Sequence, residues 1–174
     1  GEWIGLDRYI GPYLFASALF ALSAVVYVTL LRPDPLAVIG AIDPNAERIG
    51  MQAADALGVS PSRLLKTLMA KAGGAVVCVL IASDREVSLK KLAAAAGAKD
   101  AAMLPAAEAE RITGYHVGGI SPLGQRKRVR VFIDAPALAH PTIIFNGGRR
   151  GLQIEIAPAE FVKLLGATAA EIAS

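Results

Sequence analysis

The chain is poor in cysteine, histidine and aromatic residues. Its 174 residues include one cysteine and two histidines, and aromatic residues make up 6%. The single Cys78 excludes a disulfide within the chain, and its apolar surroundings at 75–82 favour a buried, inert thiol. His116 and His140 have no partner at metal-ligand spacing, so no zinc site is expected.

Charge is also sparse, and what there is lies in a few places. Charged residues are 19%, hydrophobic residues 54% and the net charge is +3, so composition alone does not indicate a nucleic-acid partner. The length is enough for one domain with a core, and there are no internal repeats or low-complexity linkers. The cations are concentrated at 126–130 and 149–150. Such clusters fit phosphate contacts, and they fit equally well a charged, solvated strand edge.

The longest uncharged stretch, residues 9–31, is nearly all apolar. This length matches the roughly 20 residues that a helix needs to cross a bilayer. We therefore predict an apolar N-terminal helix within residues 1–35, followed by a separate domain at 36–174. A membrane-associated helix, a cleaved signal peptide, a helix buried in a soluble core or dimer interface, and a segment foreign to the domain are the open readings.

Interleaved patterns predict a mixed α/β fold for the second part of the chain. Amphipathic spacing with capping residues predicts helices at 46–57, 89–96, 105–112 and 158–165. Apolar and β-branched runs predict strands at 36–42, 64–70, 75–82, 129–133, 142–145 and 152–156. The second and third of these strands flank Lys71-Ala72-Gly73-Gly74, which is typical of a hairpin turn.

Two glycine-rich segments with arginines are the most informative motifs. One runs through 117–128 and the other through 146–151. Glycine lets a backbone approach a ligand closely, and the N–H groups of such a loop can stabilise a developing oxyanion. Most glycine-rich loops are only tight turns, so the motif alone leaves both readings open. Ser121 has no His/Asp relay near it in the sequence, which favours a hydrogen-bonding or turn role over a nucleophile.

These motifs belong to a longer ordered set that covers roughly residues 42–172. The pieces are Asp43-Pro44 with Gly50, Leu57-Gly58, Leu65-Lys66-Thr67-Leu68, Asp84-Arg85-Glu86, Lys90-Lys91-Leu92 before Gly97-Ala98-Lys99, Thr113-Gly114-Tyr115, Gly118 to Gln125, and Gly147 to Leu152. In this order they resemble the YbaK family of aminoacyl-tRNA deacylases, relatives of the prolyl-tRNA synthetase editing domain.

The resemblance implies a curved, partly barrel-like mixed β-sheet with flanking helices. It also implies a cytoplasmic hydrolase that removes a wrong amino acid from the 3′ end of tRNA, most often cysteine from tRNA for proline, without metal or cofactor. The implied partners are the tRNA acceptor end and prolyl-tRNA synthetase. A substrate thiol that attacks its own ester would replace a general base, for which the chain offers no strong candidate.

The resemblance and the loop chemistry together define a predicted site. The predicted catalytic groups are Lys66, Gly118 and Gly119. The predicted substrate contacts are Ile49, Thr67, Ile120, Ser121, Pro122, Asn146, Gly147, Gly148, Arg149 and Gly151. The predicted tRNA phosphate contacts are Arg126, Lys127 and Arg128. The lysine of the Lys-Thr-Leu segment is the essential side chain that the family implies, although a strand lysine can also simply face solvent.

Three positions depart from the family pattern. Gly40 and Ile49 stand where aromatic residues are usual, and Asn146 stands where a serine is frequent. A missing pocket aromatic changes the shape of the amino-acid pocket. The departures leave two alternatives to cysteine removal: a deacylase for alanine or another small residue, and a module that binds tRNA or a synthetase without hydrolysis.

Overall fold

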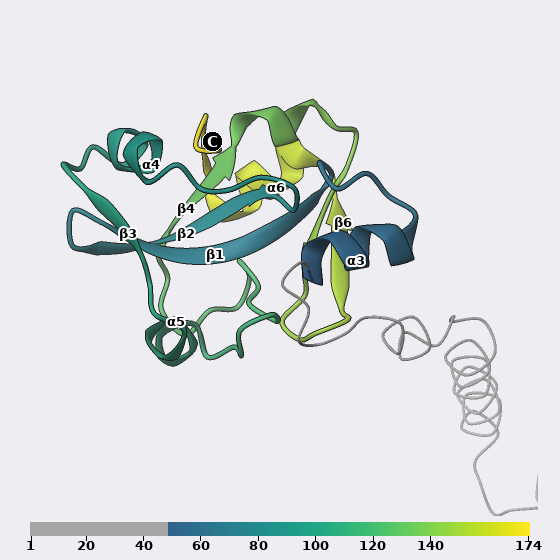
Figure 1. Cartoon of the computed structure of the whole chain (residues 1–174), viewed down its shortest axis with the longest axis horizontal. Coiled ribbons are helices and arrows are strands. Elements are labelled where there is room, and N and C mark those ends of the chain that lie inside the picture. The colour runs from purple at the N-terminus through teal and green to yellow at the C-terminus, as the bar shows by residue number, and fades with distance from the viewer. Residues whose placement is uncertain (1–48) are drawn as a thin grey trace, which may run out of the picture. The chain divides into compact units, whose positions relative to one another are not determined.

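The computed structural model describes residues 49–174 (Figure 1). The apolar run at 9–31, the strand predicted at 36–42 and Gly40 lie outside the described residues, as does Asp43-Pro44. In chain order the elements are α3 (Ile49–Leu57), β1 (Leu64–Ala72), β2 (Ala75–Ala82), α4 (Leu89–Ala96), β3 (Ala101–Met103), α5 (Ala106–Thr113), β4 (Arg130–Asp134), the 3-10 turn η3 (Ala135–Ala139), β5 (Ile143–Asn146), β6 (Gln153–Ile156), α6 (Pro158–Leu165) and β7 (Thr168–Ala170). No helix among these is long and apolar enough to cross a membrane.

The longer elements follow the sequence patterns closely. Helix α4 occupies the predicted residues, with the Ser88 side chain accepting the Lys91 N–H and Gly97 closing the helix at φ 72°. Helix α6 also has the predicted bounds, and β1 and β2 form the predicted hairpin. The three-residue strands β3 and β7 and the turn η3 were not predicted, because such short alanine-rich pieces carry no measurable periodicity.

All seven described strands belong to one mixed sheet, in the order β6-β5-β1-β2-β4-β7, with β3 paired to β1 beside this path. Pairing is antiparallel for β1–β2, β1–β3 and β5–β6, and parallel for β1–β5, β2–β4 and β4–β7. The prediction of a mixed α/β fold is confirmed. Figure 1 shows β1 and β2 as long, curved strands through the middle of the domain.

The sheet buries apolar side chains on both faces. On one face, Leu92 of α4 packs with Val79 and Ile81 of β2 and with Phe132. On the other face, a larger cluster joins residues of β1, β2, β4 and β5 to α5 and α6. Figure 1 accordingly shows α4 and α5 on opposite sides of the strands. The two layers fix the sheet, and with it the strand β1 that carries Lys66.

The two edges of β1 differ in their pairing. Toward β2 the register is continuous from Leu65 to Ala72. Along the opposite edge, β5 pairs only with Leu64 and Leu65, and β3 pairs only with residues 70–72. Residues 66–69 therefore have no strand partner on that edge within the described part of the chain. The sheet opens there, between β5 and β3.

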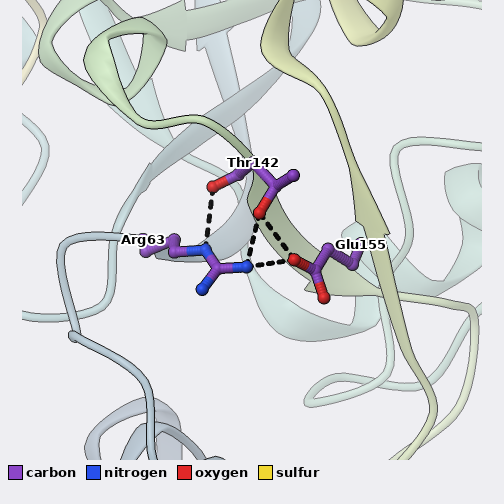
Figure 2. Close-up of polar contacts among 3 residues, drawn as sticks. All are labelled: Arg63, Thr142 and Glu155. Carbon is purple, nitrogen blue, oxygen red and sulfur yellow. Dashed lines mark hydrogen bonds and ion pairs between the residues drawn. The ribbon is translucent and has the colours of Figure 1, made fainter.

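A polar cluster fixes the junction of β1, β5 and β6 (Figure 2). Arg63, just before β1, donates through Nε to the Thr142 carbonyl oxygen at 3.0 Å and through Nη2 to the Thr142 hydroxyl and the Glu155 carboxylate. The Thr142 hydroxyl also donates to Glu155 Oε1 at 2.6 Å. This cluster links the start of β1 to the segment that leads into β5, which ends at Asn146.

Candidate active site

A cleft of about 740 Å³ opens at the interrupted edge of β1. Its lining comes from six parts of the fold: α3, β1, the turn at 83–86, the segment that joins β3 to α5, the loop at 117–120, and the facing ends of β5 and β6. Five of the predicted site residues meet in it, namely Lys66, Thr67, Gly118, Ile120 and Asn146. Segments that lie about 80 residues apart in the sequence therefore share one cavity.

Lys66 lies in the part of β1 that forms the cleft wall. Its side chain is 26% exposed, and its Nζ lies 3.0 Å from Oε1 of Glu86 in the turn before α4. Lys66 shares its face of the strand with Leu68 and Ala70, as the period of two predicts. The ammonium therefore stands at the cleft with a single carboxylate partner, and its remaining N–H groups are available to a carbonyl or phosphate oxygen.

The backbone of Thr67 faces the open edge. On the β2 side the Leu64 carbonyl accepts the Ser83 N–H at 2.8 Å, and on the opposite side the Met69 carbonyl accepts the Leu104 N–H at 2.9 Å. Because backbone groups alternate between the two edges of a strand, the N–H and C=O of Thr67 point toward the gap between β5 and β3. These are donors and acceptors that a ligand in the cleft can use.

Two buried side-chain oxygens in the lining have no hydrogen-bond partner within residues 49–174. They are Thr67 Oγ1 and Gln153 Oε1. Buried polar atoms in folded proteins are nearly always paired, because an unpaired one costs about 1–3 kcal/mol. Both atoms lie inside the cleft wall and are closed off from the cavity itself. Gln153 was not among the predicted residues, since a glutamine at the start of a short strand carries no distinctive pattern.

The loop after α5 borders the cleft. Gly118 adopts φ +86°, a conformation that only glycine takes without strain. The Gly119 N–H is engaged, since it donates to the His116 carbonyl at 2.9 Å. Among the described residues, no acceptor takes the N–H of Gly118 or Ile120, both of which line the cleft. The N–H groups of Gly118 and Ile120 are therefore uncommitted within the described residues, while the Gly119 N–H closes the turn between them.

The second glycine segment is hydrogen-bonded to the first. Asn146 donates through Nδ2 to the Gly118 carbonyl at 3.2 Å and accepts the Gly148 N–H on Oδ1 at 2.8 Å. A Cβ on Gly119 would stand 3.0 Å from Cα of Arg149, so a larger residue would push the two loops apart by a few tenths of an ångström. Arg150 donates to the Val117 carbonyl at 3.2 Å. The predicted residues Gly147, Gly148, Arg149 and Gly151 thus shape and support the loop that borders the cleft.

Ser121 and Pro122 lie outside the cleft lining. Ser121 is 1% exposed, and its hydroxyl accepts the Leu123 N–H at 3.2 Å within a tight turn. The Gln125 amide donates to the Ser121 carbonyl at 2.9 Å and reaches Sγ of Cys78 at 3.6 Å. Burial raises the pKa of the Cys78 thiol to about 12, so the thiol stays protonated at neutral pH. Neither side chain is placed to attack a ligand in the cleft.

The predicted phosphate contacts form an exposed run beside the site. Arg126, Lys127 and Arg128 are all exposed and follow the glycine loop directly, and Arg149 is exposed on the neighbouring loop. None of them lines the cleft. In residues 49–174 no three His, Cys, Asp or Glu side chains gather in a way that would hold a metal ion. The side chain of Ile49, a predicted pocket residue, lies outside the described residues.

The match of residues 43–164 to the family described as the aminoacyl-tRNA editing domain decides the family. The chain belongs to this family. The match covers more than half of the chain and includes both glycine loops and Lys66. The resemblance inferred from the ordered motifs is therefore confirmed.

Curated relatives of this editing domain agree in sequence. The chain is 40% identical over 121 residues to a protein of Enterococcus faecalis provisionally named Cys-tRNA(Pro)/Cys-tRNA(Cys) deacylase EbsC, covering 68% of this chain and 73% of that one. It is 32% identical over 80 residues to the proline–tRNA ligase of a Thermoanaerobacter species, covering 45% of this chain but only 14% of the ligase.

Solved structures agree in fold. A crystal structure of a hypothetical protein superposes with a TM-score of 0.68 at 30% identity, covering 76% of this chain and 89% of the other. A protein provisionally described as a trans-editing enzyme for prolyl-tRNA synthetase superposes with a TM-score of 0.67 at 22% identity, covering 82% of this chain and 98% of that one. At that identity the second likeness concerns the fold alone.

Proposed function

We propose that this editing domain is an aminoacyl-tRNA deacylase that acts in trans and hydrolyses the ester of mischarged tRNA. The observation that carries the proposal is that Lys66 lines one cleft together with Gly118 and Ile120, whose N–H groups have no acceptor among the described residues, in a chain of this family. A fixed cation and preorganised N–H donors are what the developing oxyanion of ester cleavage requires.

In this proposal Lys66 polarises the ester carbonyl, and the loop N–H groups stabilise the tetrahedral intermediate. The nucleophile comes from the substrate thiol or from water, because the Ser121 hydroxyl and the Cys78 thiol are buried away from the cleft. The terminal ribose oxygen leaves as the hydroxyl and takes up the proton that the attacking thiol or water gives up. After attack by the thiol, water opens the resulting thiolactone to free cysteine. Thr67 and Asn146 serve the substrate pocket, the first through its backbone groups at the open edge and the second by fixing the loop.

The proposed substrate is Cys-tRNA(Pro), as in the name given to EbsC. The exposed Arg126, Lys127 and Arg128 would contact acceptor-arm phosphates, which supply affinity with little sequence information. Prolyl-tRNA synthetase is the proposed source of the tRNA. If so, adding that synthetase should raise the deacylation rate, and an unchanged rate would remove it as a partner.

A panel of mischarged tRNAs tests the activity. Purified protein should release cysteine from Cys-tRNA(Pro) faster than alanine from Ala-tRNA(Pro), and should leave Pro-tRNA(Pro) intact. Faster release of alanine would reassign the substrate and keep the reaction. Salt-dependent binding of tRNA with no release from any member of the panel would make the chain a binding module instead.

We further propose that residues 36–174 form the deacylase domain, that it works in the cytoplasm and that residues 1–35 are an apolar extension to it. Deletion of residues 1–33 separates the two roles. The proposal expects deacylation to survive the deletion, while fractionation of cells that carry each form reports whether the extension holds the protein at a membrane. Loss of all activity in the shortened form would place the extension within the catalytic domain.

A further inference from the structure

Acidic side chains outnumber basic ones in the cleft lining. Lys66 is the one cationic side chain among the described lining residues, whereas Asp84 and Glu86 bring two carboxylates. The formal charge of the lining is therefore −1. The exposed cations at 126–128 and 149 lie outside it. A polyanionic tRNA end is thus attracted to the surface beside the cleft, while the cleft itself suits a part of the substrate that carries positive charge.

An aminoacyl ester has one such part, its free α-ammonium group. The group offers three N–H donors and accepts nothing. The cleft offers it two oxygen acceptors: the Glu86 carboxylate at the mouth and the Thr67 carbonyl at the open edge of β1. Lys66 cannot share this role, because two cations repel.

Glu86 is held in place for such a contact. Its Oε1 bonds Lys66 Nζ at 3.0 Å, whereas its Oε2 has no partner within residues 49–174. Its backbone is fixed from the end of the chain, since the Glu86 carbonyl accepts the Ser174 N–H at 2.9 Å and Val87 forms a bridge with Ala173. The side chain itself is 82% exposed, so a ligand at the cleft mouth reaches it.

We propose that Glu86 recognises the free α-ammonium of the aminoacyl ester and is a specificity-determining residue of this site. The inference rests on the proposed deacylase function and deepens it. Glu86 Oε2 accepts the α-ammonium while Oε1 keeps Lys66 beside the ester carbonyl. The site thereby selects aminoacyl esters with an unblocked amine over N-acylated ones.

Binding of a non-hydrolysable analogue tests this without relying on turnover. The probes are cysteinyl-3′-amino-3′-deoxyadenosine and its N-acetyl form, whose amide replaces the labile ester. Wild-type protein should bind the free amine more tightly by up to about fivefold, the scale expected of one exposed charge pair. Glu86→Gln should bring the two affinities together, Glu86→Asp should restore part of the preference, and Glu160→Gln on α6 should keep all of it.

Three results would overturn the assignment. The first is equal affinity of the wild type for both probes, and the second is no binding of the free-amine probe. The third is an undiminished preference in Glu86→Gln, once a thermal unfolding transition has shown that this variant is folded. Release of cysteine from Cys-tRNA(Pro) is measured separately on the wild type. If the wild type keeps the free-amine preference but releases nothing, the deacylase proposal fails while the assignment of Glu86 stands. If it releases cysteine without any preference, the reverse holds.

Discussion

The two edges of β1 do different things for this protein. The edge toward β2 is paired without a break from Leu65 to Ala72. The side chains of β2 beside it are buried on both faces of the sheet. The opposite edge is paired with strands at its two ends and lacks a strand partner across residues 66–69, where Thr67 presents its backbone N–H and C=O. One edge of β1 thus belongs to the stable centre of the sheet, and the other edge forms a wall of the cleft. The difference predicts that substitutions on the two sides will separate folding from activity.

The largest expected effect is on the open edge. Lys66→Met should lower kcat/KM for release of cysteine from Cys-tRNA(Pro) by about 10³-fold, the upper scale for removing one group that stabilises an oxyanion. Thermal unfolding should stay unchanged, because the pair with Glu86 is exposed. Lys71→Met, on the same strand and paired with Glu108 instead, is the matched control and should retain activity. Near-normal turnover in Lys66→Met would contradict the assignment of activity to the open edge of β1.

On the closed edge the effect should fall on stability. Leu80 of β2 is 0% exposed, so Leu80→Ala should lower the free energy of unfolding by about 3 kcal/mol through lost burial and a cavity. Denaturant titration measures it. Leu164→Ala on α6, where the side chain is 59% exposed, should change little. Equal losses in the two variants would show that β2 does not dominate the core.

The hydrogen bonds that Asn146 makes between the two glycine loops should matter for activity more than for folding. Asn146→Ala removes the hydrogen bonds to Gly118 and Gly148, and we expect kcat/KM to drop about tenfold. Asn146→Asp keeps the acceptor and loses the donor, so its kcat/KM should lie between the two. An Asn146→Ala enzyme with full activity would mean that the loop holds its conformation without this amide.

Loss of the polar cluster at the start of β1 should have a smaller effect on stability. Arg63→Met removes the guanidinium from the cluster in Figure 2, where side chains are 26% and 52% exposed in the pair with Glu155. We expect a cost of about 1 kcal/mol, or about 3 °C in Tm. High salt should shrink the difference from wild type. Lys163→Met, an exposed change on α6, serves as the control, and a drop as large in it would refute a specific role for the cluster.

The smallest expected effect is the response of the contact between Glu110 and Val117 to low pH. The Val117 N–H donates to the Glu110 carboxylate at 2.8 Å and holds the Glu110 pKa below its ordinary value of 4.5. A carboxyl whose pKa is lowered by folding stabilises the fold above its ordinary pKa, and that contribution is lost as pH falls through the lowered value. The Val117 amide resonance should therefore titrate with a midpoint below pH 4.5. A midpoint at or above 4.5 would contradict the contact.

The sequence was enough for the regular part of the fold. Ser88 and Gly97 mark both ends of α4, and the Gly73-Gly74 turn marks the hairpin. It was not enough for β3, β7 or the gap in β1, because pairing across the sheet is set by contacts distant in sequence. No local pattern at Leu68 or Met69 records that a neighbouring strand is missing.

The candidate site was predictable where backbone chemistry leaves a local mark. Gly118 stands out in the sequence because positive φ demands glycine, and Lys66 stands out through its family motif. Glu86 and Gln153 were missed as site residues, since an exposed glutamate in a turn and a glutamine in a short strand look ordinary until the fold brings them to the cleft. Ser121 and Pro122 were placed near the substrate, but the fold turns Ser121 inward.

The central claim is that the aminoacyl group binds at the open edge of β1. Backbone-amide chemical shifts measured with the non-hydrolysable cysteinyl-adenosine analogue test it most directly. We predict the largest shifts at Thr67, Gly118 and Ile120, with little change at Val79 on the closed edge. Shifts confined to Arg126, Lys127 and Arg128, with Thr67 and Gly118 unmoved, would contradict the account.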